Sequence, residues 1–113
     1  MSDLSGKAAL VTGASRGIGR AIAERLARDG AVVAVHYGTR AAEAREAVES
    51  IEAAGGNAFP VHAEFGVNGV AAEVDTLFRE LDATLGDTPL DILVNNAGIL
   101  DGTPIEAGDA RRL

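Results

Sequence analysis

Three closely spaced glycines stand out as residues that could hold a nucleotide. Gly13, Gly17 and Gly19 follow the apolar run from Ala8 to Val11, and a helical pattern begins at Gly17. A glycine-rich turn between a strand and a helix presents backbone N–H groups and the positive end of the helix dipole to a phosphate. The spacing therefore predicts a pyrophosphate site, and a plain glycine turn between strand and helix is the alternative.

Each glycine has a separate predicted part in this loop. Gly13 permits a tight turn, Gly17 leaves room for phosphate beside the backbone, and Gly19 lets the helix pack against the sheet. Three further loop residues, Ser15, Arg16 and Ile18, are predicted to line the same cofactor site.

The elements that position this loop alternate along the chain. Residues 7–11, 31–35, 57–61 and 90–94 resemble short buried strands. Helical spacing of apolar residues separates them, over 17–29, 40–54 and 70–85. The predicted inward stripe of the first helix is Ile18, Ala21, Ile22, Arg25 and Leu26, and that of the last helix is Val70, Val74, Leu77, Phe78, Leu81 and Leu85.

This alternation predicts an α/β fold with a Rossmann-type doubly wound parallel sheet of about four strands, in the order 3-2-1-4. Ligands bind such sheets at the carboxyl ends of the strands, where the strand order reverses. The loops after Val11 and Val94 should therefore face each other. The second of these loops reads Asn95-Asn96-Ala97-Gly98.

Composition excludes several classes of protein. The 113 residues carry a net charge of -7, which disfavours nucleic acid as a partner because binding domains for it usually have a basic face. There is no cysteine, so neither a disulfide framework nor a thiolate nucleophile is possible. No signal peptide or membrane-length apolar run is evident, and a cytoplasmic location without membrane partners is the expectation.

The glycine spacing Gly-x-x-x-Gly-x-Gly, together with Asn-Asn-Ala-Gly after the fourth strand, resembles the short-chain dehydrogenase/reductase family, including its 3-oxoacyl-acyl-carrier-protein reductase-like members. The resemblance covers residues 6–99. It implies a dinucleotide-binding half-domain over 1–99, a tail over 100–113, and hydride transfer between nicotinamide and a carbonyl or alcohol as the parent activity. It also implies that Asn95, Ala97 and Gly98 lie beside the cofactor ribose, and that Glu64 contacts adenine where members usually have aspartate.

The end of the second strand bears on cofactor choice. NAD-preferring enzymes hold the ribose 2′-hydroxyl with a carboxylate there, whereas residues 36–40 include Tyr37 and Arg40 but no acid. Arg16 and Arg40 could grip a 2′-phosphate through charge-assisted hydrogen bonds. The sequence therefore favours NADP (NADPH) over NAD, with Tyr37 included among the cofactor contacts. The alternative is that both arginines are ordinary surface residues.

Catalytic residues are not predicted in this chain. The family uses a serine and a Tyr-x-x-x-Lys pair, but the one tyrosine, Tyr37, and the one lysine, Lys7, cannot form that pair. Without it no group is placed to move the alkoxide proton. His36 and His62 each lack a second ligand at metal spacing, so both are interpreted as structural histidines and no metal site is predicted.

Three classes of function remain open. The first, which the resemblance favours, is the NADP(H)-binding portion of a short-chain reductase, inactive by itself and truncated before the catalytic residues. The others are a stand-alone NADP(H)-binding or sensing module, and a structural remnant without activity. A separate chain could also supply a catalytic half. If the sheet ends at the fourth strand, residues 90–94 form an exposed apolar edge. This edge predicts a homo-oligomer in which two copies pair through the fourth strand or exchange segments.

Overall fold

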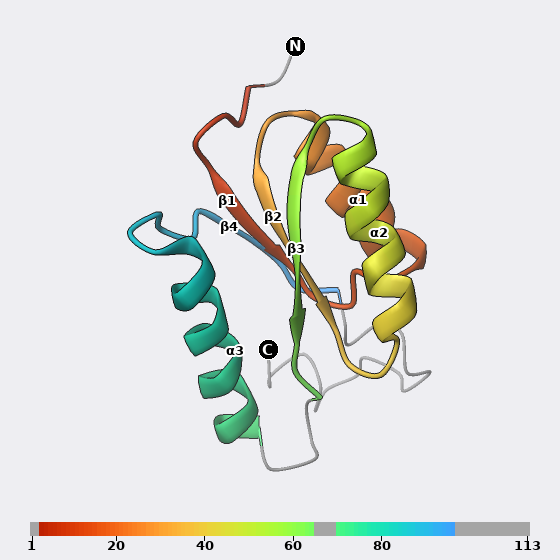
Figure 1. The fold of residues 1–113 in the computed structure, drawn as a ribbon. Coiled ribbons are helices and arrows are strands. Elements are labelled where there is room, and N and C mark those ends of the chain that lie inside the picture. The colour runs from red at the N-terminus through yellow and green to blue at the C-terminus, as the bar shows by residue number, and fades with distance from the viewer. Residues whose placement is uncertain (1–2, 65–69, 97–113) are drawn as a thin grey trace, which may run out of the picture.

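In the part of the chain that the structure describes, four parallel strands form a central sheet with helices on both faces (Figure 1). The computed structural model describes residues 3–64 and 70–96. In chain order the elements are β1 (Ala8–Val11), α1 (Gly17–Arg28), β2 (Val32–Tyr37), α2 (Ala41–Ala53), β3 (Asn57–His62), α3 (Val70–Leu85) and β4 (Ile92–Val94). The sheet order β3-β2-β1-β4 confirms the predicted Rossmann-type arrangement. The predicted boundary after residue 99 lies outside the described residues.

Strand β2 extends two residues beyond its predicted end. His36 pairs with Val61 and Tyr37 pairs with His62, so the ladder between β2 and β3 continues to the carboxyl edge of the sheet. At β4 the strand begins at Ile92 instead of residue 90. Asp91 nevertheless holds Ala8, because its backbone N–H donates to the Ala8 carbonyl at 2.9 Å and its carboxylate accepts from the Ala8 N–H at 3.1 Å.

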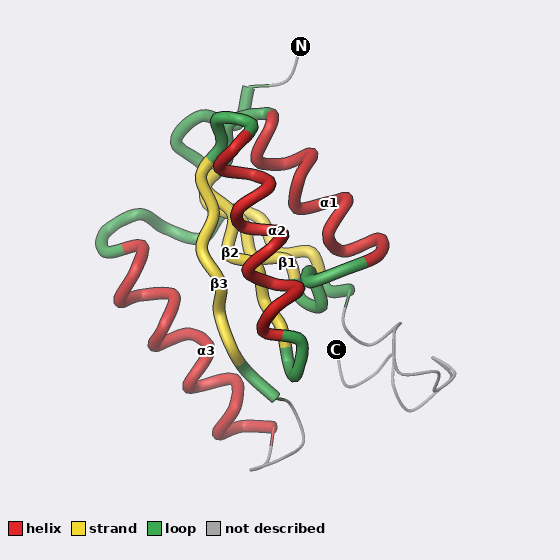
Figure 2. Tube along the Cα trace, turned by 45° about the vertical axis from the view of Figure 1, so that its right-hand side comes forward, coloured by secondary structure: helices red, strands yellow, loops and turns green. Residues whose placement is uncertain are grey.

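Helices α1 and α2 cover one face of the sheet, and α3 lies on the other face (Figure 2). The α1 and α2 face is packed mainly with small side chains, which bring the helices close to the strands. Its buried members are Ala9, Val11, Ala14, Ala23, Ala27, Ala31, Val33, Val35, Ala44, Ala47, Val48 and Ile51.

The buried face of α1 agrees with the predicted stripe only in part, because Ile22 and Leu26 pack against the core whereas Ala21 and Arg25 are exposed. Gly19, Ala23 and Ala27 are the buried residues of the helix, whereas Ile18 is 65% exposed. The cause is steric. Gly19 sits against the loop before the helix, and this contact fixes the rotation of α1 so that the preceding residue, Ile18, faces outward.

Helix α3 buries part of its predicted stripe. Leu77 and Leu81 pack with Leu10, Ala34 and Val61 on their face of the sheet. Two other predicted members are substantially exposed, at 37% for Val74 and 43% for Phe78. Within the described part of the chain, this face is therefore less completely covered than the α1 and α2 face.

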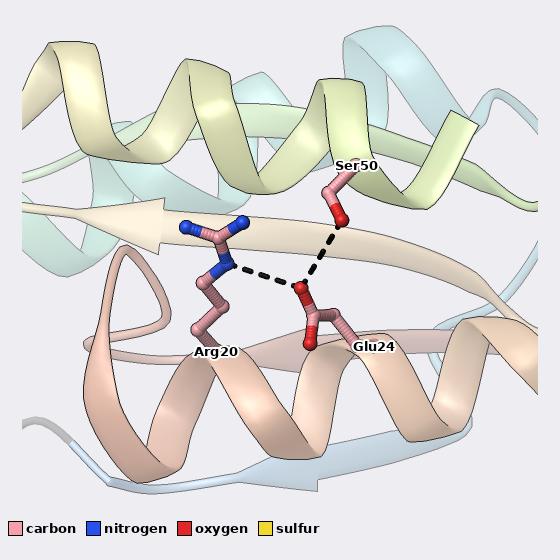
Figure 3. A network of polar contacts seen from close by, with 3 residues as sticks. All are labelled: Arg20, Glu24 and Ser50. Carbon is pink, nitrogen blue, oxygen red and sulfur yellow. Dashed lines mark hydrogen bonds and ion pairs between the residues drawn. The ribbon is translucent and has the colours of Figure 1, made fainter. Parts of the chain in front are cut away.

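A polar network connects α1 with α2 on their outer side (Figure 3). Glu24 accepts a hydrogen bond from Arg20 at 3.0 Å and a longer one from Ser50 at 3.4 Å. The groove between the two helices is lined by residues of α1 such as Glu24, by Ser50 near the end of α2, and by Ala54 and Gly55, which directly follow α2. It lies toward the amino edge of the sheet, away from the glycine loop. Among the helices described, none is long and apolar enough to span a membrane.

Candidate cofactor site

The predicted glycine loop lies between β1 and α1 at the carboxyl edge of the sheet. Gly13 has φ +62° and Gly17 has φ +64°, a region of backbone conformation that favours glycine. A Cβ built on Gly17 would meet no atom within 4 Å, so the space beside this residue is open. Open space next to a backbone turn is what the predicted phosphate position requires.

Gly19 is needed for a close approach within the loop itself. A Cβ at this position would lie 2.3 Å from the carbonyl oxygen of Gly13 and 2.5 Å from Nδ2 of Asn96. The prediction assigned Gly19 to packing of the helix on the sheet. In the structure the tight contacts are instead with the glycine loop and with the loop after β4.

The amino terminus of α1 is electrostatically open to an anion. Its first turn, which is fully described, holds no acidic residue, and the Arg16 side chain makes no capping hydrogen bond. The first N–H groups of a helix have no partner inside it, and the helix dipole adds partial positive charge. Arg16 and Ile18 are exposed here, whereas Ser15 is buried.

Asn96 ties the loop after β4 to the glycine loop. Its backbone N–H donates to Oγ1 of Thr12 at 2.8 Å, and its Nδ2 donates to the carbonyl oxygen of Gly13 at 3.2 Å. Asn96 is 3% exposed, whereas Asn95 is exposed, with its Oδ1 3.3 Å from Oγ1 of Thr12. The prediction named Asn95 as a site residue and missed Asn96, although the order of the strands could have indicated that both follow β4 into the same corner.

His36 connects the glycine loop to the end of β3. Its Nδ1 accepts a hydrogen bond from the Gly13 N–H at 2.9 Å, and its Nε2 lies 2.9 Å from the carbonyl oxygen of Ala63. Its own carbonyl accepts from the Ala14 N–H at 2.9 Å. Burial lowers the pKa of His36 most, the nearby charge of His62 adds to this lowering, and the hydrogen bond to Ala63 opposes it.

The ends of β2 and β3 bring three further polar residues together. The rings of Tyr37 and His62 are tilted by 40° with centroids 5.2 Å apart, and His62 Nε2 lies 3.2 Å from a carboxylate oxygen of Glu64. A Cβ on Gly38 would lie 3.9 Å from Cγ of Glu64. A carboxylate therefore does lie near the end of β2, although it comes from the loop after β3.

Arg40 stands at the amino terminus of α2. Its Nη1 donates to Oε1 of Glu43 at 3.0 Å, and both side chains are substantially exposed. An exposed pair of this kind is weak, so it leaves the guanidinium able to exchange partners. The remaining predicted site residues, Ala97 and Gly98, lie outside the described residues. Within residues 3–64 and 70–96, no cluster of three or more His, Asp or Glu side chains could hold a metal ion.

Comparison with known proteins assigns this architecture to a family. The model of the family described as short chain dehydrogenase matches residues 7–112. The chain is 43% identical to the short-chain dehydrogenase/reductase homolog YusS of Bacillus subtilis, over 88% of this chain and 87% of the relative. It is 47% identical to the 3-oxoacyl-acyl-carrier-protein reductase FabG of Staphylococcus aureus, over 82% of this chain and 36% of the relative. The chain belongs to the short-chain dehydrogenase/reductase family of oxidoreductases.

Solved structures agree with this assignment. The angucycline C-6 ketoreductase LanV with bound NADP is 60% identical, with a TM-score of 0.75 over 85% of this chain and 38% of that chain. The present chain thus spans about two fifths of the length of several relatives that it matches, at 36–41%, but most of the length of YusS.

Proposed function

We propose that this chain is the NADP(H)-binding portion of a short-chain ketoreductase-type oxidoreductase. The observation that carries the proposal is the open, left-handed glycine turn at an amino-terminal helix end without acids. The NADP bound to LanV, at 60% identity, supports the same cofactor. The predicted contacts are Gly13, Ser15, Arg16, Gly17, Ile18, Gly19, Tyr37, Arg40, Glu64, Asn95, Ala97 and Gly98.

The preference for NADPH over NADH rests on Arg16 and Arg40. Both lie at the carboxyl edge of the sheet, Arg16 before α1 and Arg40 before α2. Charge-assisted contacts of this kind contribute about 1.5 to 3 kcal/mol each. Glu64 opposes the preference, because its carboxylate lies near Gly38 and would repel a 2′-phosphate. The two guanidiniums therefore have to outweigh one carboxylate that is itself paired with His62.

A fluorescence titration of the 113-residue chain with NADPH and NADH tests this proposal. We expect saturable NADPH binding at least about tenfold tighter than NADH binding, since about 1.4 kcal/mol corresponds to a factor of ten. Arg40→Ala should reduce this ratio. Arg79→Ala is the matched control, because Arg79 is an exposed arginine on α3 that pairs with Asp75 along its helix. Equal binding of both cofactors would contradict the arginine assignment.

The chain by itself should not transfer hydride. Its 113 residues contain one tyrosine and one lysine, at positions that cannot form Tyr-x-x-x-Lys. An assay that follows NADPH oxidation in the presence of a reactive carbonyl compound should therefore show no turnover. Turnover that persists after repeated purification would overturn this part of the proposal.

A stand-alone NADP(H)-binding or sensing module is the second candidate. Its support is that the chain covers 87% of YusS, so a relative of similar length exists. Measurable NADPH affinity of a folded chain fits both candidates, and restoration of turnover by a second chain would favour the first. A folded chain that binds neither cofactor would instead indicate a structural remnant. For either candidate function we propose a cytoplasmic location.

We also propose that two copies associate through the β4 edge. Within the described chain β4 pairs only with β1, and Leu93 is 59% exposed. An exposed strand edge is a template for pairing with a second chain. Sedimentation velocity at tens of micromolar should detect a dimer, and a purely monomeric sample would contradict the proposal.

A further inference from the structure

The buried ring of His36 connects two loops that the proposed function assigns to different parts of the cofactor. On one side it holds Gly13, the first residue of the predicted phosphate loop, at 2.9 Å. On the other side it holds the carbonyl of Ala63, also at 2.9 Å. Ala63 directly precedes Glu64, the predicted adenine contact. One side chain thus spans the phosphate loop and the adenine loop.

The two contacts determine where the ring carries its proton. A backbone N–H can only donate, so Nδ1 has to be the acceptor from Gly13. A carbonyl oxygen can only accept, so Nε2 has to be the donor to Ala63. The arrangement therefore requires a neutral imidazole with its hydrogen on Nε2, a tautomer assigned from its partners.

This arrangement also divides the amides of the glycine loop. The N–H of Gly13 is occupied by the His36 ring, and the N–H of Ala14 is occupied by the His36 carbonyl. The N–H groups at the amino terminus of α1, in contrast, have no partner inside the helix and are available to a phosphate. His36 therefore holds the start of the glycine loop, at Gly13 and Ala14, and this segment leads directly to the amino terminus of α1.

We propose that His36 is a positioning residue for the cofactor, which holds the glycine loop through Nδ1 and releases it when Nδ1 is protonated. The inference rests on the proposed NADPH binding. Protonation places a second donor against the Gly13 N–H, so the contact at 2.9 Å turns from attractive to repulsive. The glycine loop then loses its side-chain contact with β2 and keeps only the backbone hydrogen bond from Ala14 to the His36 carbonyl, and cofactor binding weakens.

The surroundings of His36 favour the neutral form of its ring. The side chain is 3% exposed, and both burial and the charge of His62 lower its pKa. By the alternation of side chains along β2, His36 shares the α3 face with Ala34. The ionisable groups on the surrounding elements are His62, Glu64, Arg16 in the glycine loop and Glu73 in the first turn of α3.

Two isosteric substitutions separate the two contacts. The side-chain oxygen of asparagine can take the place of Nδ1, so His36→Asn keeps the acceptor for Gly13 and loses the donor to Ala63. The amide nitrogen of glutamine can take the place of Nε2, so His36→Gln keeps the donor to Ala63 and loses the acceptor. At pH 8 we expect NADPH affinity within about twofold of wild type for the first, and about threefold to tenfold weaker for the second, the range of one lost hydrogen bond.

The pH dependence supplies a readout that a merely structural role would not move. The NADPH dissociation constant is measured from pH 8 to pH 5 for the wild type and for His36→Asn, with Arg79→Ala as an exposed control outside the predicted contacts. We expect the binding of the wild type and the control to weaken more steeply as pH falls than that of His36→Asn. Titration of the 2′-phosphate is common to all three and cancels in the ratio of the constants.

Defined outcomes overturn the inference. Equal loss of affinity in His36→Asn and His36→Gln, with circular dichroism showing both folded, would mean that His36 supports the fold without positioning the loop. An unchanged pH profile in His36→Asn would exclude the protonation step. If the wild type binds no NADPH at pH 8, the proposed function fails. The inference is then tested on the cofactor-free chain, where the amide resonance of Gly13 should follow the titration of His36, and a resonance that ignores it would overturn the contact.

Discussion

Two neighbouring regions of the molecule differ in how well their side chains are buried and paired. One is the corner around the glycine loop, and the other is the exposed edge formed by β4. In the corner, Thr12, His36 and Asn96 are all buried, and each holds backbone groups of a neighbouring loop. At the edge, Leu93 is 59% exposed although its partner Leu10 on β1 is 1% exposed.

Buried polar groups are paired throughout the described chain, whereas the burial of apolar side chains is incomplete in one part of it. In the part that the structure describes, no side-chain nitrogen or oxygen that is buried lacks a hydrogen-bond partner. The large apolar side chains left exposed are concentrated on α3 and β4, at Val74, Phe78 and Leu93, apart from Ile18. The buried polar groups of the corner are therefore paired without a ligand, whereas the exposed apolar side chains lie mainly on α3 and β4.

The largest effect is expected from filling the closest approach in the corner. Gly19→Ala places a Cβ within 2.3 Å of the Gly13 carbonyl, a backbone atom that cannot move aside freely. Overpacking of this kind costs about 1 to 3 kcal/mol or more. We expect urea unfolding to show a loss at the top of this range, together with loss of NADPH binding.

Gly17→Ala provides the matched glycine for comparison. Its Cβ meets open space, and only the positive φ of +64° is unfavourable. The expected cost is about 1 to 2 kcal/mol, from the left-handed conformation alone. A Gly17→Ala variant less stable than Gly19→Ala would show that the corner is not close-packed.

A smaller effect is expected from the two adjacent asparagines. Asn96→Ala removes the buried amide that donates to Gly13 and should lower the free energy of unfolding by about 1 to 3 kcal/mol. The exposed Asn95→Ala should change it by about 0.5 kcal/mol or less. Thermal unfolding of both variants checks the difference, and equal values would remove the distinction between these residues.

The pH dependence of stability sharpens the description of the corner. Because the pKa of His36 is lowered from its ordinary value of 6.5 in the folded chain, the unfolded chain binds more protons between the two values. The free energy of unfolding therefore rises with pH in that window, and this stability is fully present above pH 6.5 and lost as pH falls toward the folded pKa. The free energy of unfolding, measured by urea titration at several pH values from 8 to 5, should change less with pH in His36→Asn than in the wild type. An equal change with pH in that variant would refute the assignment.

The smallest effect on stability is expected at the β4 edge. Leu93→Lys changes an exposed side chain and should alter the free energy of unfolding by about 0.5 kcal/mol or less. An edge lysine opposes strand pairing, so the same variant should reduce the proposed dimerisation in sedimentation experiments. Phe78→Lys, an exposed position on α3, is the control. If Phe78→Lys alone dissociates the dimer, the α3 face is the contact instead of the edge.

Much of the fold was readable from local patterns. Apolar runs and helical spacing placed all four strands and three helices close to their observed bounds, and the right-handed crossover rule led to the order β3-β2-β1-β4. The same order placed the loops after Val11 and Val94 together, where Asn96 now contacts Thr12 and Gly13. These features depend on residues near one another in sequence and on general rules of chain connection.

Tertiary structure alone decided which side chains meet. Ile18 faces outward because Gly19 lies against Gly13. That contact cannot be predicted from helical periodicity. The bridge from Gly13 through His36 to Ala63 joins residues from three separate segments. Its partners become neighbours only when three parallel strands end at one edge, so the sequence determined the elements and their order, whereas the packed sheet determined the polar contacts of the site.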